Sequence, residues 1–235
     1  MGIQEIISKA NEEMRNMLES VCSYNLKFVR NKKQKKLLEE IIYAMSVIDR
    51  KFFVEDEEFA YLDTALAIGQ GQTISQPSTV ARMLMLAELE EGDSVLEVGS
   101  GSGWNSSLIS FLVYPEKVVS IDIIPKLVEK AKNNVSRLKQ NLDYNIKKEI
   151  SPEFLIKNIF NYSGEYNKII VTAGISDEQE DKIWEIAERL LKDNGILICP
   201  RISGKMIIFK KNEKLEREET KEEYVFVPLL LASEM

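Results

Sequence analysis

The stretch E-V-G-S-G-S-G-W, residues 97–104, places Gly99, Gly101 and Gly103 at alternate positions directly after a short apolar run. Glycine permits positive φ angles and lets the backbone approach a ligand closely, and the helix that follows offers unpaired N–H groups. The next apolar run ends in Asp122, 19 residues after Gly103, where a carboxylate suits the hydroxyl groups of a ribose. Together these residues predict a site for a nucleoside cofactor.

The residue order in this glycine turn, residues 99–103, distinguishes two kinds of cofactor site. A dinucleotide fingerprint needs a small residue at the sixth position of G-x-G-x-x-G/A, where helix and strand pack closely, and this chain has Trp104 there. The form G-x-G-x-G after the acidic Glu97 is instead similar to motif I of class I S-adenosylmethionine-dependent methyltransferases. An ordinary glycine turn between strand and helix stays the alternative, and Asp122 favours the cofactor site.

No histidine occurs among the 235 residues. This excludes Ser-His-Asp and Cys-His catalytic arrangements, H-E-x-x-H metal sites and the commonest general base near neutral pH. Cys22 and Cys199 lie far apart without metal-ligand spacing, so we expect reduced thiols, no disulfide and no metal site. Any chemistry must therefore use another base or none.

The net charge of −7 argues against a broad surface for nucleic-acid phosphates, which are bound by clustered lysines and arginines. The stretch KFVRNKKQKK, from Lys27 to Lys36, either attracts an acidic partner or lies in solvent, and we favour the second. No apolar run reaches the roughly 20 residues of a membrane span, and the first residues carry charges where a signal peptide is apolar. We therefore expect a cytoplasmic protein with neither membrane nor nucleic acid as a partner.

Hydrophobic periodicity predicts the elements that hold these residues. One predicted helix runs from Ile3 to Val21 and a second from Leu37 to Ile48. Further helices are predicted near 79–90, 104–113, 125–140 and 177–192, with Gly195 as the C-terminal cap of the last. Short apolar runs predict strands at 94–99, 118–122, 167–174, 195–200, 205–211 and 224–230.

The alternation predicts an α/β fold, a Rossmann-like, mostly parallel seven-stranded sheet with helices on both faces and an N-terminal helical extension. We expect one compact unit in which residues 1–78 form the helical and substrate-loop segment. Residues 79–235 then form the S-adenosylmethionine-binding domain, with ligands beyond the carboxyl ends of the strands.

Seven segments, in order, resemble the protein L-isoaspartate O-methyltransferases. They are A-M-S-V-I-D-R-K-F-F-V (44–54), A-Y-L-D (60–63), I-G-Q-G-Q-T-I-S-Q-P (68–77), V-L-E-V-G-S-G-S-G-W-N (95–105), I-I-V-T-A-G (169–174), G-I-L-I-C-P (195–200) and F-V-P-L (226–229). The family methylates the α-carboxylate of L-isoaspartyl residues, which arise from aged Asn and Asp, to start their repair. The resemblance implies the same activity here, with S-adenosyl-L-methionine as cofactor and isoaspartyl peptides and proteins as substrates.

The resemblance also implies roles for individual residues. Ser75 matches the active-site serine of the family. The pocket between cofactor and substrate, and the region near the bound peptide, are matched by Thr73, Ile74, Gln76, Val227 and Pro228. The positions that hold S-adenosylmethionine are matched by Glu97, Gly99, Ser100, Gly101, Gly103, the acidic ribose ligand Asp122 and its neighbour Ile123.

This chemistry suits a site without histidine. A carboxylate, with an ordinary pKa of about 4, is already an anion near neutral pH and can attack a sulfonium methyl without a base. Ser75 would then orient the carboxylate by hydrogen bonding. The alternative is a structural serine that caps the helix beginning near Pro77.

The chain departs from the family where adenine and peptide would bind. The family has G-D-G after the third strand, and here the region reads KKEISPEFLIKN, with Glu149 or Ser151 as possible substitutes. Ser78 stands where histidine is common, Asp49 replaces a proline, and RISGKMIIFKKNEK is shorter than the family pattern. Two alternatives therefore stay open: the same fold with another acceptor, a small-molecule carboxylate or a nucleic acid, or a non-catalytic protein that binds the cofactor or a partner.

Overall fold

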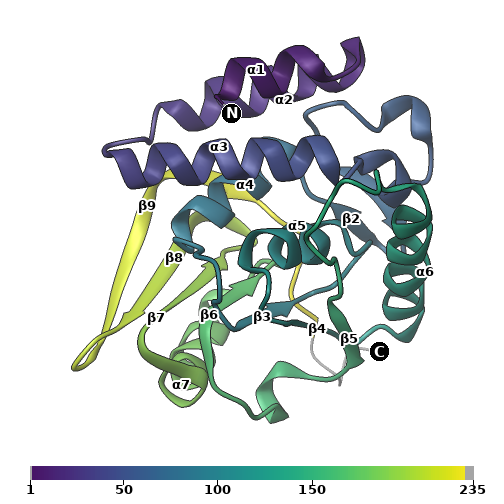
Figure 1. Cartoon of the computed structure of the whole chain (residues 1–235). Coiled ribbons are helices and arrows are strands. Elements are labelled where there is room, and N and C mark those ends of the chain that lie inside the picture. Colours follow the sequence, from purple (N-terminus) through teal and green to yellow (C-terminus); the bar gives the residue numbers. More distant parts are fainter. Residues whose placement is uncertain (1, 231–235) are drawn as a thin grey trace.

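A seven-stranded sheet forms the centre of the structure, a computed structural model that describes residues 2–230 (Figure 1). The strands lie in the order β5-β4-β3-β6-β7-β8-β9. They are β3 (Val95–Val98), β4 (Val118–Asp122), β5 (Glu153–Ile156), β6 (Tyr166–Val171), β7 (Leu191–Pro200), β8 (Ser203–Lys211) and β9 (Leu215–Val225). Neighbours from β5 to β7 pair in parallel, and β8 and β9 continue the sheet antiparallel. The predicted α/β class is confirmed.

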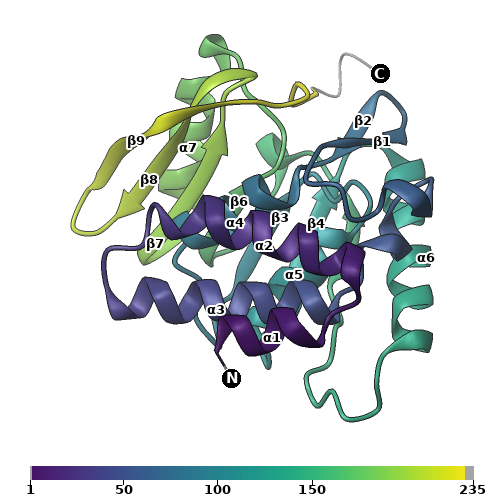
Figure 2. The same ribbon diagram turned by 90° about the horizontal axis from the view of Figure 1, so that it is seen from above.

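Helices cover both faces of this sheet (Figures 1 and 2). One face carries α4 (Pro77–Leu86), α5 (Trp104–Val113) and α6 (Pro125–Asn141), and the other carries α7 (Glu180–Leu190). All four residues of β3 are buried, Val95 in the cluster under α4 to α6 and Leu96 in the cluster under α7. This is the pattern of a central parallel strand, whose side chains alternate between two covered faces.

The N-terminal segment consists of α1 (Ile3–Lys9), α2 (Glu12–Leu26) and α3 (Lys32–Val47), so the prediction of a single helix up to Val21 is wrong. The chain is extended at Ala10 and Asn11, and Asn11 Oδ1 accepts the backbone N–H of Met14 at 2.9 Å as the N-cap of α2. Both helices bury apolar residues in the same core as α3 to α6, so the apolar periodicity continues across the break. Periodicity alone does not reveal such a cap.

A small antiparallel hairpin of β1 (Leu66–Gly69) and β2 (Gln72–Ile74) lies outside the main sheet. Its strands are too short to give a periodic signal, and sequence analysis did not predict them. Four 3₁₀ turns complete the elements: η1 (Arg50–Phe53), η2 (Glu57–Phe59), η3 (Ile159–Asn161) and η4 (Asp177–Gln179). The hairpin carries the residues just before Ser75.

The predicted helix cap at Gly195 is wrong, because the chain enters β7 at Leu191, directly after α7. Gly195 lies inside the strand, and the left-handed residue of this region is Asn194, with φ 61°. The pairing of β6 with β7 shifts between Tyr166 and Lys168, which accommodates the extra residues. Gly195 is required by close packing, since an added Cβ would lie 2.7 Å from the carbonyl oxygen of Lys192.

The predicted last strand, 224–230, is also wrong except at its start, because β9 occupies Leu215–Val225. Most of the side chains of β9 are charged and exposed, as suits an edge strand that pairs only with β8. The apolar residues 226–230 leave the sheet and cross the carboxyl ends of the strands. We call residues 226–230 the C-terminal strap; residues 231–235 of the predicted cofactor domain lie outside the described part of the chain.

Within residues 2–230, no helix combines the length and the apolar character needed to cross a membrane. In the same range, no three His, Cys, Asp or Glu residues are grouped to hold a metal ion. Cys22 and Cys199 are both buried free thiols.

Candidate active site

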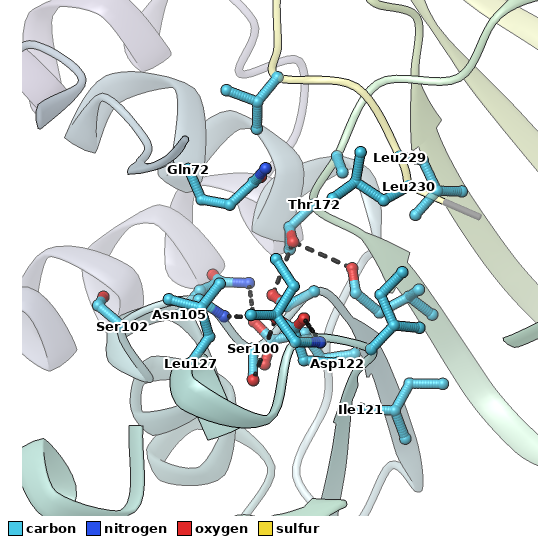
Figure 3. Close-up of a pocket in the computed structure, with 18 of the residues that line it drawn as sticks. Gln72, Ser100, Ser102, Asn105, Ile121, Asp122, Leu127, Thr172, Leu229 and Leu230 are labelled. Carbon is cyan, nitrogen blue, oxygen red and sulfur yellow. Dashed lines mark hydrogen bonds between the residues drawn. The ribbon is translucent and has the colours of Figure 1, made fainter. Parts of the chain in front are cut away.

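The main cleft opens at the carboxyl ends of β3, β4 and β6, where the strand order reverses around β3. In Figure 3, Gln72 and the strap residues Leu229 and Leu230 lie above the cleft, and Ser100 and Asp122 lie beneath it. The cleft brings together most of the predicted site residues, namely Thr73, Ile74, Ser75, Glu97, Gly99, Ser100, Gly101, Asp122, Ile123, Val227 and Pro228.

Two predicted residues, Gly103 and Gln76, are not among those that line the main cleft. Gly103 has φ 87° and starts α5, and an added Cβ would lie 3.1 Å from Ala131 Cα in α6. Its role is therefore close packing between two helices. Gln76 instead donates through Nε2 to Asp63, at 3.2 Å.

Gly99 supports the cleft directly. Its φ of 99° lies in the region that side-chain-bearing residues rarely adopt, and an added Cβ would overlap Thr172 Oγ1. Thr172 Oγ1 donates to the carbonyl of Gly99 at 2.7 Å. The contact locks the first residue of the glycine turn to the end of β6.

Asp122 ends β4, and its carboxylate lies across the glycine turn. It accepts the backbone N–H groups of Gly101 at 3.1 Å and Ile124 at 3.0 Å, and the hydroxyl of Ser100 at 3.4 Å. Burial raises the pKa of Asp122, and the backbone donors oppose this rise. The carboxylate therefore holds the turn in place and still lines the cleft.

Glu97 is fully buried in β3, two residues before Gly99, the first residue of the glycine turn. Its carboxylate accepts from Asn105 Nδ2 at 2.8 Å, from Ser120 Oγ at 2.5 Å and from the hydroxyl of Ser106. Burial raises the pKa of Glu97 from 4.5 to about 7, although these donors favour the charged form. Near neutral pH this group therefore lies close to half-protonation.

The raised pKa of Glu97 predicts that this residue makes a pH-dependent contribution to the stability of the fold. Because the folded protein binds the Glu97 proton more tightly than the unfolded chain, its stabilising contribution is complete below pH 4.5 and is lost as pH rises through about 7. We expect Glu97→Gln to reduce the fall of the unfolding free energy between pH 5 and 8 by about 3 kcal/mol. Urea unfolding at several pH values measures this.

Glu185→Gln, an exposed substitution on α7, is the matched control and should retain the wild-type pH profile. Parallel profiles for wild type and Glu97→Gln would contradict the prediction.

The donor set of the cleft fits a nucleoside cofactor with a charged amino-acid part. Asn105 Oδ1 is buried and has no hydrogen-bond partner, while its Nδ2 donates to Glu97. A buried acceptor without a partner is costly, and a ligand cation or N–H beside Asn105 would satisfy it. Figure 3 shows Asn105 and Asp122 on the same side of the cleft, to either side of Ser100.

Ser75 lies between β2 and α4 and lines the main cleft. The N-cap of α4 is Gln76, and the first turn is capped from another segment by Asp63, which accepts the backbone N–H of Ser78 at 2.8 Å. The alternative in which Ser75 caps this helix is therefore wrong. A second cavity, the adjoining groove, shares Thr73 and Ser75 with the main cleft.

The C-terminal strap brings Val227 and Pro228 into the cleft. The N–H of Gly174 donates to Val227 O at 2.8 Å, and the N–H of Leu229 donates to Gly174 O at 2.7 Å. An added Cβ on Gly174 would lie 2.6 Å from the backbone of Ile202, so only glycine allows residue 174 to lie this close to Ile202 while it also pairs with the strap. The strap therefore closes the cleft through main-chain contacts.

The segment after β5 supplies cleft residues that sequence analysis missed. Lys157, Asn158 and Ile159 line the cleft, whereas the proposed substitutes Glu149 and Ser151 precede β5 and are not among its lining residues. Sequence analysis predicted no strand between 122 and 167, so it could not locate the residues that follow β5. The signal available was the position of Asn158, a polar residue just after a strand end, as Asp122 ends β4.

The structure gives the contacts of Trp104 and of the basic stretch, residues 27–36. Trp104 is 1% exposed, its indole N–H donates to Ile48 O at 3.0 Å, and it also contributes to the lining of the main cleft. In the basic stretch, Lys33 pairs with Glu90 and Lys36 with Glu40, and all four side chains are largely in solvent.

The model of the protein-L-isoaspartate(D-aspartate) O-methyltransferase family matches residues 23–234. A protein-L-isoaspartate O-methyltransferase of Pyrococcus abyssi is 42% identical over 163 residues, 68% of this chain and 70% of that protein. One of Fervidobacterium nodosum is 37% identical over 187 residues, 77% and 88% of the two chains. A solved protein-L-isoaspartate O-methyltransferase structure superposes with a TM-score of 0.67 at 25% identity, over 90% of this chain, which spans 65% of that longer chain.

Proposed function

The chain belongs to the protein-L-isoaspartate(D-aspartate) O-methyltransferase family, and we propose that it transfers a methyl group to the α-carboxylate of L-isoaspartyl residues in damaged proteins. The observation that carries this proposal is that Ser75 lines two neighbouring cavities at once, one suited to a nucleoside cofactor and one suited to a peptide. Methyl transfer needs such a junction, because donor and acceptor must meet in line.

The main cleft is the proposed S-adenosylmethionine site. Bound there, the cofactor supplies an activated methyl group on a sulfonium. Asp122 is the proposed acceptor for the ribose hydroxyls, with Ile123 beside it, and Asn158 is the proposed contact of the adenine. Glu97, Asn105 and the turn residues Gly99, Ser100 and Gly101 would hold the amino-acid part, and Gly103 would support the turn from behind.

The adjoining groove is the proposed path of the substrate peptide. Its walls come from Tyr24 of α2, Gln76 and Thr79 of the α4 start, and Tyr224 and Phe226 near the chain end. Thr73 and Ile74 would form the partition between cofactor and substrate, with Val227 and Pro228 on the opposite side. Gln76 is therefore assigned to the substrate side.

The proposed reaction needs no general base. The substrate carboxylate is anionic near neutral pH, and Ser75 would donate a hydrogen bond that orients one of its oxygens. The strap and the β1–β2 hairpin would keep water from the reacting atoms. This explains how a chain without histidine can carry out the transfer.

The basic stretch and the two cysteines bear on other partners and on the location of the protein. Nucleic acid stays outside the proposal, because lysines of the basic stretch pair with nearby glutamates. Two buried free thiols suit a reducing compartment such as the cytoplasm. Residues 1–78 and 79–235 are proposed to act as one unit.

Methyl transfer from labelled S-adenosylmethionine tests the function, with an L-isoaspartyl peptide and its ordinary aspartyl twin as acceptors. We expect transfer to the isoaspartyl peptide alone, and an about 20-fold lower kcat/KM in Ser75→Ala, because a hydrogen bond to a charged group is lost. Ser20→Ala, an exposed serine on α2, is the control.

The negative outcomes separate the alternatives. Absence of transfer with intact cofactor binding, measured by calorimetry, would mean that the acceptor is different. Absence of cofactor binding would favour a non-catalytic protein.

A further inference from the structure

Arg50 carries a charged side chain at 0% exposure in the middle of the fold. Its Nη1 donates to the carbonyls of Ala60 at 2.7 Å and Leu62 at 3.2 Å, and its Nη2 donates to those of Thr64 at 2.9 Å and Ser75 at 3.2 Å. Burying a charge is costly unless it is well hydrogen-bonded. Four main-chain carbonyls, one of them from Ser75, accept hydrogen bonds from the two Nη groups, while Nε is buried without a partner among the described residues.

Asp63 holds the other side of Ser75. It belongs to the same loop, between two of the carbonyls that Arg50 binds. Its carboxylate accepts the backbone N–H of Ser78 at 2.8 Å, the hydroxyl of Ser78 at 2.6 Å and Nε2 of Gln76 at 3.2 Å. Arg50 thus fixes the backbone of Ser75, and Asp63 fixes the N-cap Gln76 and the first turn of α4.

The same guanidinium reaches the cofactor side of the cleft. It lies over the ring of Trp104, 5.3 Å from the ring centroid. Trp104 directly follows the glycine turn, and its indole N–H donates to Ile48 O, two residues before Arg50. One side chain therefore contacts both the serine segment and the helix that begins at the glycine turn.

Building on the function proposed above, we propose that Arg50 and Asp63 are positioning residues, which act through Ser75 by fixing its place relative to the glycine turn. Neither side chain is among those that line the main cleft. Lysine cannot replace Arg50, because a single ammonium does not match the fork that serves four carbonyls. Asparagine at position 63 keeps the size of the side chain but offers only one acceptor oxygen to three donors.

A double-mutant cycle tests this proposal, with Arg50→Lys, Asp63→Asn and Ser75→Ala singly and in pairs. We expect Arg50→Lys and Asp63→Asn each to lower kcat about tenfold, since a small displacement of a positioning group is enough. The dissociation constant for S-adenosylmethionine should stay within about threefold of wild type. In the Ser75→Ala background the same substitutions should lower kcat less than about threefold.

Arg217→Lys is the control, because it makes the same substitution at an arginine outside the cleft lining. The Arg217 guanidinium pairs with Glu180 and Glu219 on the surface. If Arg50→Lys does not fold, the cycle of Asp63→Asn with Ser75→Ala decides. Circular dichroism shows whether Arg50→Lys is folded.

Each outcome has a defined meaning. Equal losses in the wild-type and Ser75→Ala backgrounds, or a parallel loss of cofactor affinity, would overturn the positioning role while Ser75 keeps its own. Wild-type kcat in Ser75→Ala alone would overturn the role of Ser75 in the proposed function and the positioning role together. An inactive wild type would overturn the proposed function itself and, with it, the positioning role.

Discussion

Gly99→Ala is expected to lower the affinity for S-adenosylmethionine about 100-fold, because a left-handed φ costs about 1–3 kcal/mol and the added Cβ crowds the site as well. Gly99 has φ 99°, and the Cβ would overlap Thr172 Oγ1, which is hydrogen-bonded to the end of β3. The methyl group can be accommodated only if the glycine turn moves away from the cleft. Titration calorimetry with S-adenosylmethionine measures the change.

Gly92→Ala is the matched control for this substitution. Gly92 has φ 86°, close to that of Gly99, but an added Cβ would meet nothing within 4 Å. It is not among the residues that line the main cleft. Both variants should lose stability, and only Gly99→Ala should lose cofactor affinity; equal affinities would contradict the prediction.

Asp122→Ala is expected to have an effect of similar size, about 100-fold in cofactor affinity, since hydrogen bonds to a charged acceptor contribute about 1.5–3 kcal/mol each. The substitution removes the proposed ribose acceptor and also leaves the N–H groups of Gly101 and Ile124 without their partner. Asp122→Asn, which keeps one acceptor oxygen, should give an intermediate loss. Equilibrium dialysis with labelled S-adenosylmethionine ranks the three proteins.

Asp93→Ala controls for the loss of a partly buried carboxylate that supports a turn. Asp93 accepts the N–H of Glu90 at 2.8 Å and, like Asp122, has its pKa raised by burial. It does not line the main cleft. If Asp93→Ala weakened cofactor binding as much as Asp122→Ala, the loss would reflect general destabilisation.

The sequence predicted those parts of the site that depend on neighbouring residues. The glycine turn follows a strand and precedes a helix within eight residues, 97–104, so its geometry could be read locally. Asp122 could be placed because carboxyl ends of neighbouring parallel strands meet at one edge. Ser75 depended on the family resemblance, since no local rule singles out one serine in a loop.

The elements that sequence analysis missed are set by pairing between strands that are distant in sequence. The edge position of β9 allows a strand of exposed charges, which has no apolar signal. Leu191 leaves its helix because it pairs with Tyr166, and Asn158 enters the cleft because β5 pairs with β4. Neither partner is near in sequence, so periodicity could not reveal the contact.

Residues 225–230 link the binding of the two proposed ligands. Residues 225 and 226 line the adjoining groove, and residues 227–230 line the main cleft, so one short segment borders both cavities. A ligand in one cavity that holds this segment in its present position also preserves the wall of the other cavity. Cofactor and peptide binding should therefore be cooperative, and linkage requires the cofactor to raise peptide affinity by the same factor as the peptide raises cofactor affinity.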